Sequence, residues 1–341
     1  MKCVSCGSDA KYKDRKLLGT CISCGKKFVF EPQTGDPFTD VGFQAMIDRV
    51  SGNATVKFSS TNLFYEVKRI KKSKAPVVAI TAIAAVVSLG LLLGGQFIGG
   101  AITALATGVL YMLLSNFGNP LRNLSRSAFN DSFGRWREVH GDPPGLLKPK
   151  QLPAQASAHL QAELETYSFD RAVITDIGAT AELLLANDFH FENNCAVLSI
   201  DGTPAHAFEA VRRMLRKNPR LEVFALHDAT TEGCTLAFRL KHDPAWFKEF
   251  GTVRDVALRP AQARARAFKG LWQPHRELPD PHSSISPSEM KWLSQWTLPL
   301  AAIRPEQLIK RLYRAMHLPS GGDDNWSEDA VATDGGADSF G

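Results

Sequence analysis

The sequence LEVFALHDATTEGCTLAFRL, residues 221–240, gives the clearest indication of the fold class of this chain. Its first apolar residues form a short continuous run that ends at His227 and Asp228, and a turn of small residues follows before a second apolar pattern. Continuous runs of this kind are typical of strands that are buried on both faces, as in parallel sheets. The stretch therefore predicts a strand, a turn and a helix, with an acidic side chain at the carboxyl end of the strand.

Two earlier segments of the chain repeat this pattern. The run AVIT ends at Asp176 before the helical pattern ATAELLLAN, and the run CAVLSI ends at Asp201 before AHAFEAVRRMLRKN. A further run, VRDVAL, ends at Arg259. Strands that alternate with helices form right-handed crossovers in an open parallel sheet. We therefore expect residues 166–275 to form an α/β domain of the Rossmann-like class.

Acidic side chains at the strand ends are the candidate functional site. The carboxyl ends of parallel strands lie at one edge of the sheet, and ligands bind where the strand order reverses. Asp176 and Asp228 are the candidate catalytic residues, with Asp201 and Glu232 as candidate neighbours in a Mg²⁺ site. Oxygen ligands suit Mg²⁺, and such an ion could hold a phosphate and activate water. Alternatively, each acid only caps the helix that follows its strand.

The same residues carry a resemblance to a known family. VFALHDATTEGCTLAFRL, preceded by VITDIG and VLSIDG, resembles the Toprim domain of primases and topoisomerases over residues 171–260. The resemblance implies a Mg²⁺ site in which Asp228 matches the first acid of an Asp-x-Asp motif. Thr230 stands in place of the second acid, and Asp176 stands where the family has glutamate. With these departures from the motif, we expect a degenerate Toprim-like domain. The departures affect the expected catalytic activity more than the expected fold.

The amino terminus contains two Cys-x-x-Cys pairs, each followed by glycine. This spacing lets two thiolates from one tight turn reach the same ion. Residues 1–35 are too few to bury a core, so we expect a zinc ribbon whose folding energy comes from a structural Zn²⁺. A redox pair or unpaired thiols are the alternative. The four candidate ligands are Cys3, Cys6, Cys21 and Cys24.

Residues 36–74 are expected to form a small helix–strand–helix unit that is similar to a winged helix. Tyr65 lies in a basic context in this unit, which suggests a catalytic tyrosine. The alternative is a packing residue of an amphipathic helix. A winged-helix-like unit with a tyrosine ahead of a Toprim-like domain resembles the A subunit of topoisomerase VI. Residues 117–165 are expected to be a juxtamembrane linker.

Residues 75–121 contain no Asp, Glu, Lys, Arg or His. Two apolar stretches in this segment are each long enough to cross a hydrocarbon layer of about 30 Å. Lys and Arg precede the first stretch and Arg follows the second, which places both flanks in the cytoplasm. We expect a two-span transmembrane hairpin at residues 75–116 of an inner (plasma) membrane protein with both termini cytoplasmic. A buried soluble helix pair is the alternative.

The remaining features leave the partner open. Residues 276–318 are expected to be helical, and residues 319–341 to be a disordered acidic tail. With 40 basic and 35 acidic residues, the net charge of +5 is too small to indicate nucleic-acid binding by itself. A basic group after the fourth strand could face phosphate, lipid or only solvent. It comprises Arg254, Arg259, Arg264, Arg266 and Lys269.

Two functions fit this sequence. In the first, a membrane-anchored protein uses its Toprim-like domain to dock a partner or to bind a phosphate-containing ligand. In the second, the domain is a Mg²⁺-dependent phosphotransfer or nuclease-type enzyme that acts on nucleic acid. The candidate partners are the membrane, a nucleic acid or nucleotide, and a protein bound through the zinc ribbon or the acidic tail.

Overall fold

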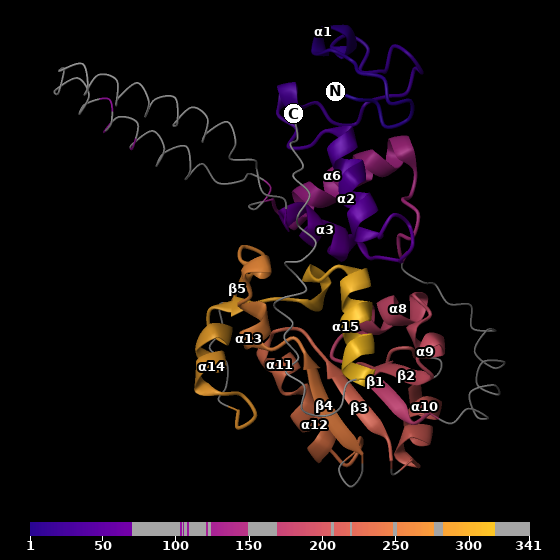
Figure 1. The fold of residues 1–341 in the computed structure, drawn as a ribbon, viewed down its shortest axis with the longest axis vertical. Helices are drawn as coiled ribbons and strands as arrows, with labels where there is room; N and C mark the ends of the chain where they lie inside the picture. The colour runs from indigo at the N-terminus through magenta and orange to yellow at the C-terminus, as the bar shows by residue number, and fades with distance from the viewer. Residues whose placement is uncertain are drawn as a thin grey trace.

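The computed structural model describes residues 1–69, 103, 105, 108, 121, 124–148, 169–205, 208–218, 220–247, 251–275 and 282–317. A sheet with its helices forms one end of the molecule, and a small helical unit lies between the sheet and the amino-terminal residues (Figure 1). Buried apolar side chains of the helical unit and of one face of the sheet belong to the same core cluster.

Four parallel strands form the sheet, in the order β2-β1-β3-β4. Helices connect successive strands, and the α/β architecture expected for this part of the chain is confirmed. The strands are β1 (Arg171–Thr175), β2 (Cys195–Ser199), β3 (Glu222–Leu226) and β4 (Thr252–Ala257). The connecting helices are α8 (Gly178–Ala186), α9 (Phe189–Glu192), α10 (Phe208–Arg216), α11 (Thr231–Cys234) and α12 (Leu236–His242).

Both faces of the sheet are buried, as the continuous apolar runs predict. Successive side chains of a strand point to opposite faces, so neighbours in the sequence enter different cores. Val173 of β1 and Phe224 of β3 lie in the cluster that continues into the helical unit. Ile174 and Val223 lie in the second cluster, which also contains Leu215 and other residues from α10 and α12.

The helical unit begins with α2 (Asp40–Val50) and α3 (Ser60–Arg69). The hydroxyl of Thr39 accepts a hydrogen bond from the Gly42 amide and caps α2. The strand expected between the two helices is absent from the described residues 51–59, where only Phe58 pairs, with Leu146. Gly52, Asn53 and Ala54 have positive φ angles of 54°, 56° and 67°, a left-handed turn that an extended strand does not allow.

A third helix, α6 (Arg126–His140), completes the helical unit. This finding corrects the expectation that residues 117–165 form a linker. Phe129, Phe133 and Trp136 recur at helical spacing and are buried, which gives α6 an apolar face. Trp136 lies with its ring centroid 5.0 Å from that of Phe43, so α6 packs directly on α2.

The carboxyl-terminal described residues fold back over the sheet domain. Both helices expected in residues 276–318 are present, and Ser286 and Glu289 form a capping box at the start of the first. The elements after β4 are α13 (Pro260–Ala263), η3 (Arg266–Phe268), β5 (Gln273–Pro274), α14 (Pro287–Leu293), β6 (Trp296–Thr297), η4 (Leu300–Ala302) and α15 (Pro305–His317).

Polar side chains of α3 fasten the helical unit to residues 300–304. The buried Glu66 carboxylate accepts hydrogen bonds from Nε and Nη2 of Arg304, each at 2.8 Å. Asn62 Nδ2 donates to the carbonyl oxygen of Ala301 at 3.2 Å, and Arg69 Nη2 donates to the carbonyl oxygen of Ala302 at 2.5 Å. A bidentate pair of this kind fixes both position and orientation.

Two of the expected segments lie wholly or almost wholly outside the described residues. The transmembrane hairpin expected at 75–116 is described only at residues 103, 105 and 108, and the acidic tail expected at 319–341 is not described. Among the helices that are described, none combines the length and the apolar character needed for a membrane span.

We predict that Glu66→Gln destabilises the protein strongly. Removing one partner of a buried ion pair leaves the other charge uncompensated, at a cost of about 3–5 kcal/mol. Urea unfolding of the purified chain measures the free energy of unfolding. The matched control is Glu306→Gln, because Glu306 pairs with Lys310 at the surface, where the two side chains are 44% and 64% exposed. The control should change stability by less than about 1 kcal/mol, and an equal loss in both variants would contradict the prediction.

Candidate functional site

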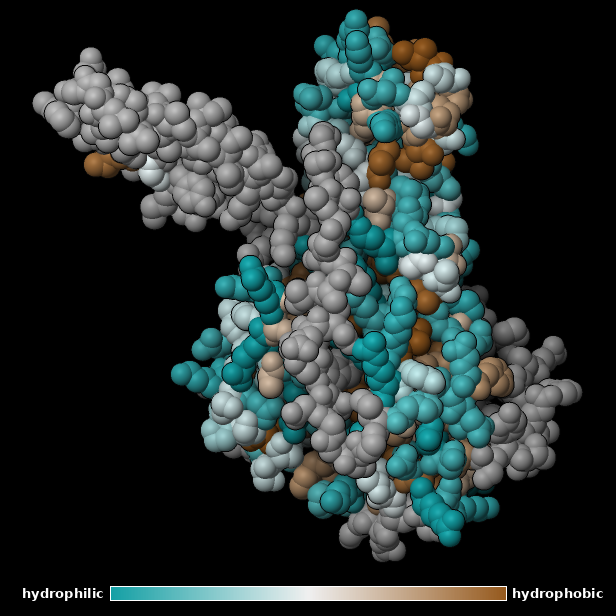
Figure 2. All heavy atoms as spheres, in the orientation of Figure 1, coloured by the Kyte–Doolittle hydropathy of each residue, from teal (hydrophilic) through white to brown (hydrophobic). Residues whose placement is uncertain are grey.

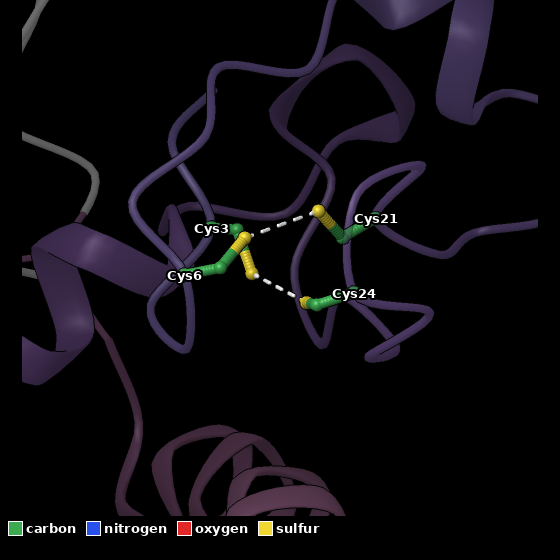
Figure 3. Close-up of side chains that lie close together, drawn as sticks. All are labelled: Cys3, Cys6, Cys21 and Cys24. Atoms are coloured by element: carbon green, nitrogen blue, oxygen red, sulfur yellow. Dashed lines mark hydrogen bonds between the residues drawn. The ribbon is translucent and has the colours of Figure 1, made fainter.

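Four cysteines converge at the end of the molecule that carries α1 (Tyr12–Arg15). The Sγ atoms of the four cysteines all lie within 4.8 Å of one another, and Figure 3 shows the four side chains converging. The Sγ atoms of Cys3 and Cys24 are 3.7 Å apart, and those of Cys6 and Cys21 are 3.6 Å apart. Four sulfurs at about 2.3 Å from one Zn²⁺ would be about 3.8 Å apart in a tetrahedron. The cluster is therefore compatible with a metal site.

The two Cys-x-x-Cys turns have the same backbone geometry. The Gly7 amide donates to the Cys3 carbonyl at 2.8 Å, and the Gly25 amide donates to the Cys21 carbonyl at 2.8 Å. Both glycines are left-handed, with φ of 72° and 71°, a conformation that favours glycine. The local sequence thus dictates both halves of the cluster. We refer to residues 1–35 as the cysteine clip.

The second candidate site is at the carboxyl ends of β1 and β3. The strand order places these two strands side by side, and the order reverses between them. Asp176 follows β1 and Asp228 follows β3, and the Asp228 amide donates to Asp176 Oδ2 at 2.8 Å. A Cβ atom on residue 233 would lie 2.9 Å from the same carboxylate oxygen, so Gly233 permits this close approach. The structure thus brings the two candidate catalytic acids together.

The Asp228 carboxylate is buried beside backbone donors. Its Oδ1 accepts a hydrogen bond of 2.7 Å from the Leu300 amide. Burial first, and then the negative charge of Asp176, raise the pKa of Asp228 to about 7. Burial also raises the pKa of Asp176, although the amide of Asp228 opposes that shift. Burial and the charge of its neighbour therefore favour the protonated form of Asp228 over a pair of negative charges.

His227 lies beside this group of acids. Its side chain is fully buried, Nδ1 lies 2.7 Å from the Asp228 carbonyl oxygen and Nε2 lies 2.9 Å from Asp255 Oδ1. Burial alone would lower the pKa of His227, but the hydrogen bond and charge of Asp255 and the other nearby oxygens outweigh it and raise that pKa. Both ring nitrogens face acceptors, so the geometry favours the imidazolium form.

Asp255 is a member of this site that the sequence analysis does not identify. It lies on β4 and also pairs with Arg259, with 2.9 Å between Arg259 Nε and Asp255 Oδ2. Its sequence signal is a charged residue inside the apolar run VRDVAL. Of the five basic residues that the sequence analysis places after the fourth strand, Arg254 lies within β4. Arg259 and Arg264 hold the chain instead of facing a ligand, because they donate to the carbonyl oxygens of Ser284 and Ser288.

The other predicted neighbours of the site have local roles. Asp201 accepts hydrogen bonds from the amides of Gly178 at 2.7 Å and Thr203 at 3.1 Å. Thr230 caps α11 through the Gly233 amide, and Glu232 is exposed. Within the described residues, only the four cysteines gather three or more potential metal ligands closely enough to share an ion.

Tyr65 is buried against the second site. Gln273 Nε2 donates a hydrogen bond to its hydroxyl. Burial, followed by the negative charge of Asp228, raises the pKa of Tyr65 above its usual range. A phenol that is 2% exposed and hydrogen-bonded behaves as a packing residue in this conformation.

We predict that the pH dependence of stability reports the buried proton of Asp228. The folded pKa of about 7 exceeds the unfolded value of about 3.9. The protonated form therefore stabilises the fold below about pH 4, and this contribution is lost as pH rises through 7. Between pH 4.5 and 8 the wild type should lose about 2–4 kcal/mol relative to Asp228→Asn, measured by urea unfolding of the purified chain. Asp201→Asn is the control, since the pKa of Asp201 is lowered and its trend has the opposite sign; a constant difference for Asp228→Asn would refute the prediction.

We predict that the clip binds one Zn²⁺ per chain. Elemental analysis of the purified chain should give one equivalent, and Cys24→Ser should lose most of it, because three thiolates hold the ion less tightly than four. Chelation should increase amide exchange in residues 1–35 and leave the sheet unchanged. Cys195→Ser is the control because Cys195 is buried in β2. Zinc retained after the Cys24 change would rule out the four-thiolate site.

The described residues thus hold two candidate sites, the cysteine clip and the acid pair at the reversal of strand order. No protein-family model, no curated protein and no solved structure matches this chain. The function is inferred from the geometry of these two sites.

Proposed function

We propose that the chain is a membrane-tethered docking protein. Its α/β domain binds a partner or a phosphate-containing ligand without performing metal-dependent chemistry. The observation that carries the proposal is the buried His227, which lies with both ring nitrogens against oxygen acceptors beside Asp228. Grouped carboxylates require a positive charge, and here an imidazolium provides it in place of a divalent ion.

The chain itself covers the carboxyl end of β3. Ala229 and Leu298 exchange two backbone hydrogen bonds, of 2.8 and 3.2 Å, and the Leu300 amide binds the Asp228 carboxylate. Mg²⁺ is normally held by one or two carboxylates and several waters in open octahedral geometry. In the segment that follows β6, the Leu300 amide instead takes up Oδ1 of Asp228 with a hydrogen bond of 2.7 Å. This arrangement supports a structural acid pair.

The tether and the clip support a docking role for the whole chain. The uncharged residues 75–121, with basic residues before them and Arg after them, favour a membrane hairpin at 75–116. A four-cysteine site leaves no coordination position for substrate, so Zn²⁺ in the clip would be structural. The protein would thereby present a rigid α/β domain at the cytoplasmic side of the membrane.

A Mg²⁺-dependent enzyme that acts on nucleic acid is the second candidate function. One observation favours it: within the described part of the chain, Asp176 Oδ1 is buried and has no hydrogen-bond partner. An unpaired buried acceptor is costly, and an ion or a water could satisfy it. For this function, residues 298–300 would have to leave the end of β3 and expose Asp228.

The two functions differ in their response to divalent metal. We predict that adding Mg²⁺ or Mn²⁺ to the detergent-solubilised chain leaves its melting temperature unchanged, in the wild type and in Asp228→Asn alike. Inorganic phosphate, cyclic nucleotides and single-stranded and duplex DNA are tested in the same assay, where a bound ligand raises the melting temperature by mass action. Asp14→Asn, in the exposed part of the clip, controls for surface binding of ions. A metal-dependent rise that only Asp228→Asn abolishes would establish the enzyme candidate instead.

A further inference from the structure

The cysteine clip exposes three large aliphatic side chains within a short stretch. Leu17 is 89% exposed, Leu18 is 78% exposed and Ile22 is 72% exposed. Figure 2 shows hydrophobic surface among hydrophilic residues at the end of the molecule that carries α1. Exposed apolar groups that gather in this way mark contact sites for proteins or membranes.

The clip that carries this apolar tip is also rich in exposed lysines. The clip has six exposed lysines, which are Lys2, Lys11, Lys13, Lys16, Lys26 and Lys27. Its exposed acids are Asp9, which pairs with the amino terminus at 2.9 Å, and Asp14. Arg15 is buried and pairs with Glu31, so it adds no charge to the surface. The tip therefore combines aliphatic side chains with an excess of positive charge.

This combination fits an anionic lipid surface better than a nucleic acid. Bases are held by stacking on aromatic side chains, whereas the exposed large side chains of the tip are aliphatic. Aliphatic residues beside lysines are the composition of segments that lie in the membrane interface, with the apolar groups among the acyl chains and the cations at the headgroups.

The end of the clip packs against the helices that border the expected hairpin. The Asp40 carboxylate at the start of α2 accepts hydrogen bonds from the amides of Val29 at 3.0 Å and Phe30 at 2.9 Å. Phe30 stacks on Trp136 of α6, with ring centroids 6.1 Å apart. The apolar segment lies between α3 and α6 in the sequence, so the clip contacts helices that precede and follow that segment.

We propose that the tip of the cysteine clip, formed by Leu17, Leu18 and Ile22, inserts into the headgroup region of an anionic membrane, where the exposed lysines of the clip add electrostatic attraction. The proposal rests on the proposed membrane tether, which brings the clip to the bilayer surface. Insertion adds a second contact with the membrane and fixes the orientation of the α/β domain relative to the bilayer.

The test uses the full chain, loaded with Zn²⁺, in nanodiscs of phosphatidylcholine alone or of phosphatidylcholine with phosphatidylserine in a ratio of about 7 to 3, a composition chosen to give a negative surface potential. Hydrogen–deuterium exchange is measured for the peptide that covers residues 16–23. We predict that exchange at the tip slows at least about tenfold in the anionic discs relative to the neutral ones, as expected when the tip leaves water. The double variant Leu17→Ser/Leu18→Ser should abolish the effect, and Lys13→Glu/Lys16→Glu should reduce it.

The matched control is Phe191→Ser, which removes a side chain that is 70% exposed on the sheet domain and should leave the protection unchanged. Zinc content is measured for each variant, so that a misfolded clip is recognised. Equal exchange in both kinds of disc overturns the proposal, as does protection that appears only when duplex DNA is added. A chain that does not remain with the discs refutes the tether itself, which separates that failure from a failure of the tip to insert.

Discussion

The buried imidazolium of His227 is the interaction on which the sheet edge depends. It joins β3 to β4 through Asp255, and it offsets the negative charge of the acids that follow β1 and β3. Without a cation at this position, Asp176 and Asp228 would repel each other in a medium that screens charge poorly. Nearby acids can therefore pack inside the protein, and the same arrangement leaves little need for an added ion.

Residues 298–304 transmit this constraint to the rest of the molecule. At one end, Leu300 binds the Asp228 carboxylate, and at the other, Arg304 binds Glu66 of α3. The same short segment thus closes the sheet edge and anchors the helical unit. A partner that displaced it from Asp228 would also strain the contacts of α3. This dependence supports the proposed docking on the outer surface over catalysis at the strand ends.

Local patterns predicted much of this arrangement. The apolar runs predict a parallel sheet, which places Asp176 and Asp228 at one edge, and the spacing of the cysteines predicts their convergence. Helix α6 could also have been predicted, since Phe129, Phe133 and Trp136 repeat at helical intervals, but the sequence analysis gives these residues as part of a linker. The contact of Leu300 with Asp228 could not be predicted from the sequence, because the two residues are 72 positions apart and the contact produces no periodic pattern. The role of His227 could not be predicted either, because it depends on an acid from a neighbouring strand.

The position of α6 has a consequence for biosynthesis. The aromatic core of the helical unit is built from residues on both sides of the apolar segment, with Phe30 and Phe43 before it and Phe129 and Trp136 after it. During synthesis, α2 and α3 emerge from the ribosome before α6. Their apolar faces stay uncovered until more than fifty further residues have been made. During that interval the nascent chain exposes to chaperones the surface that α6 later covers.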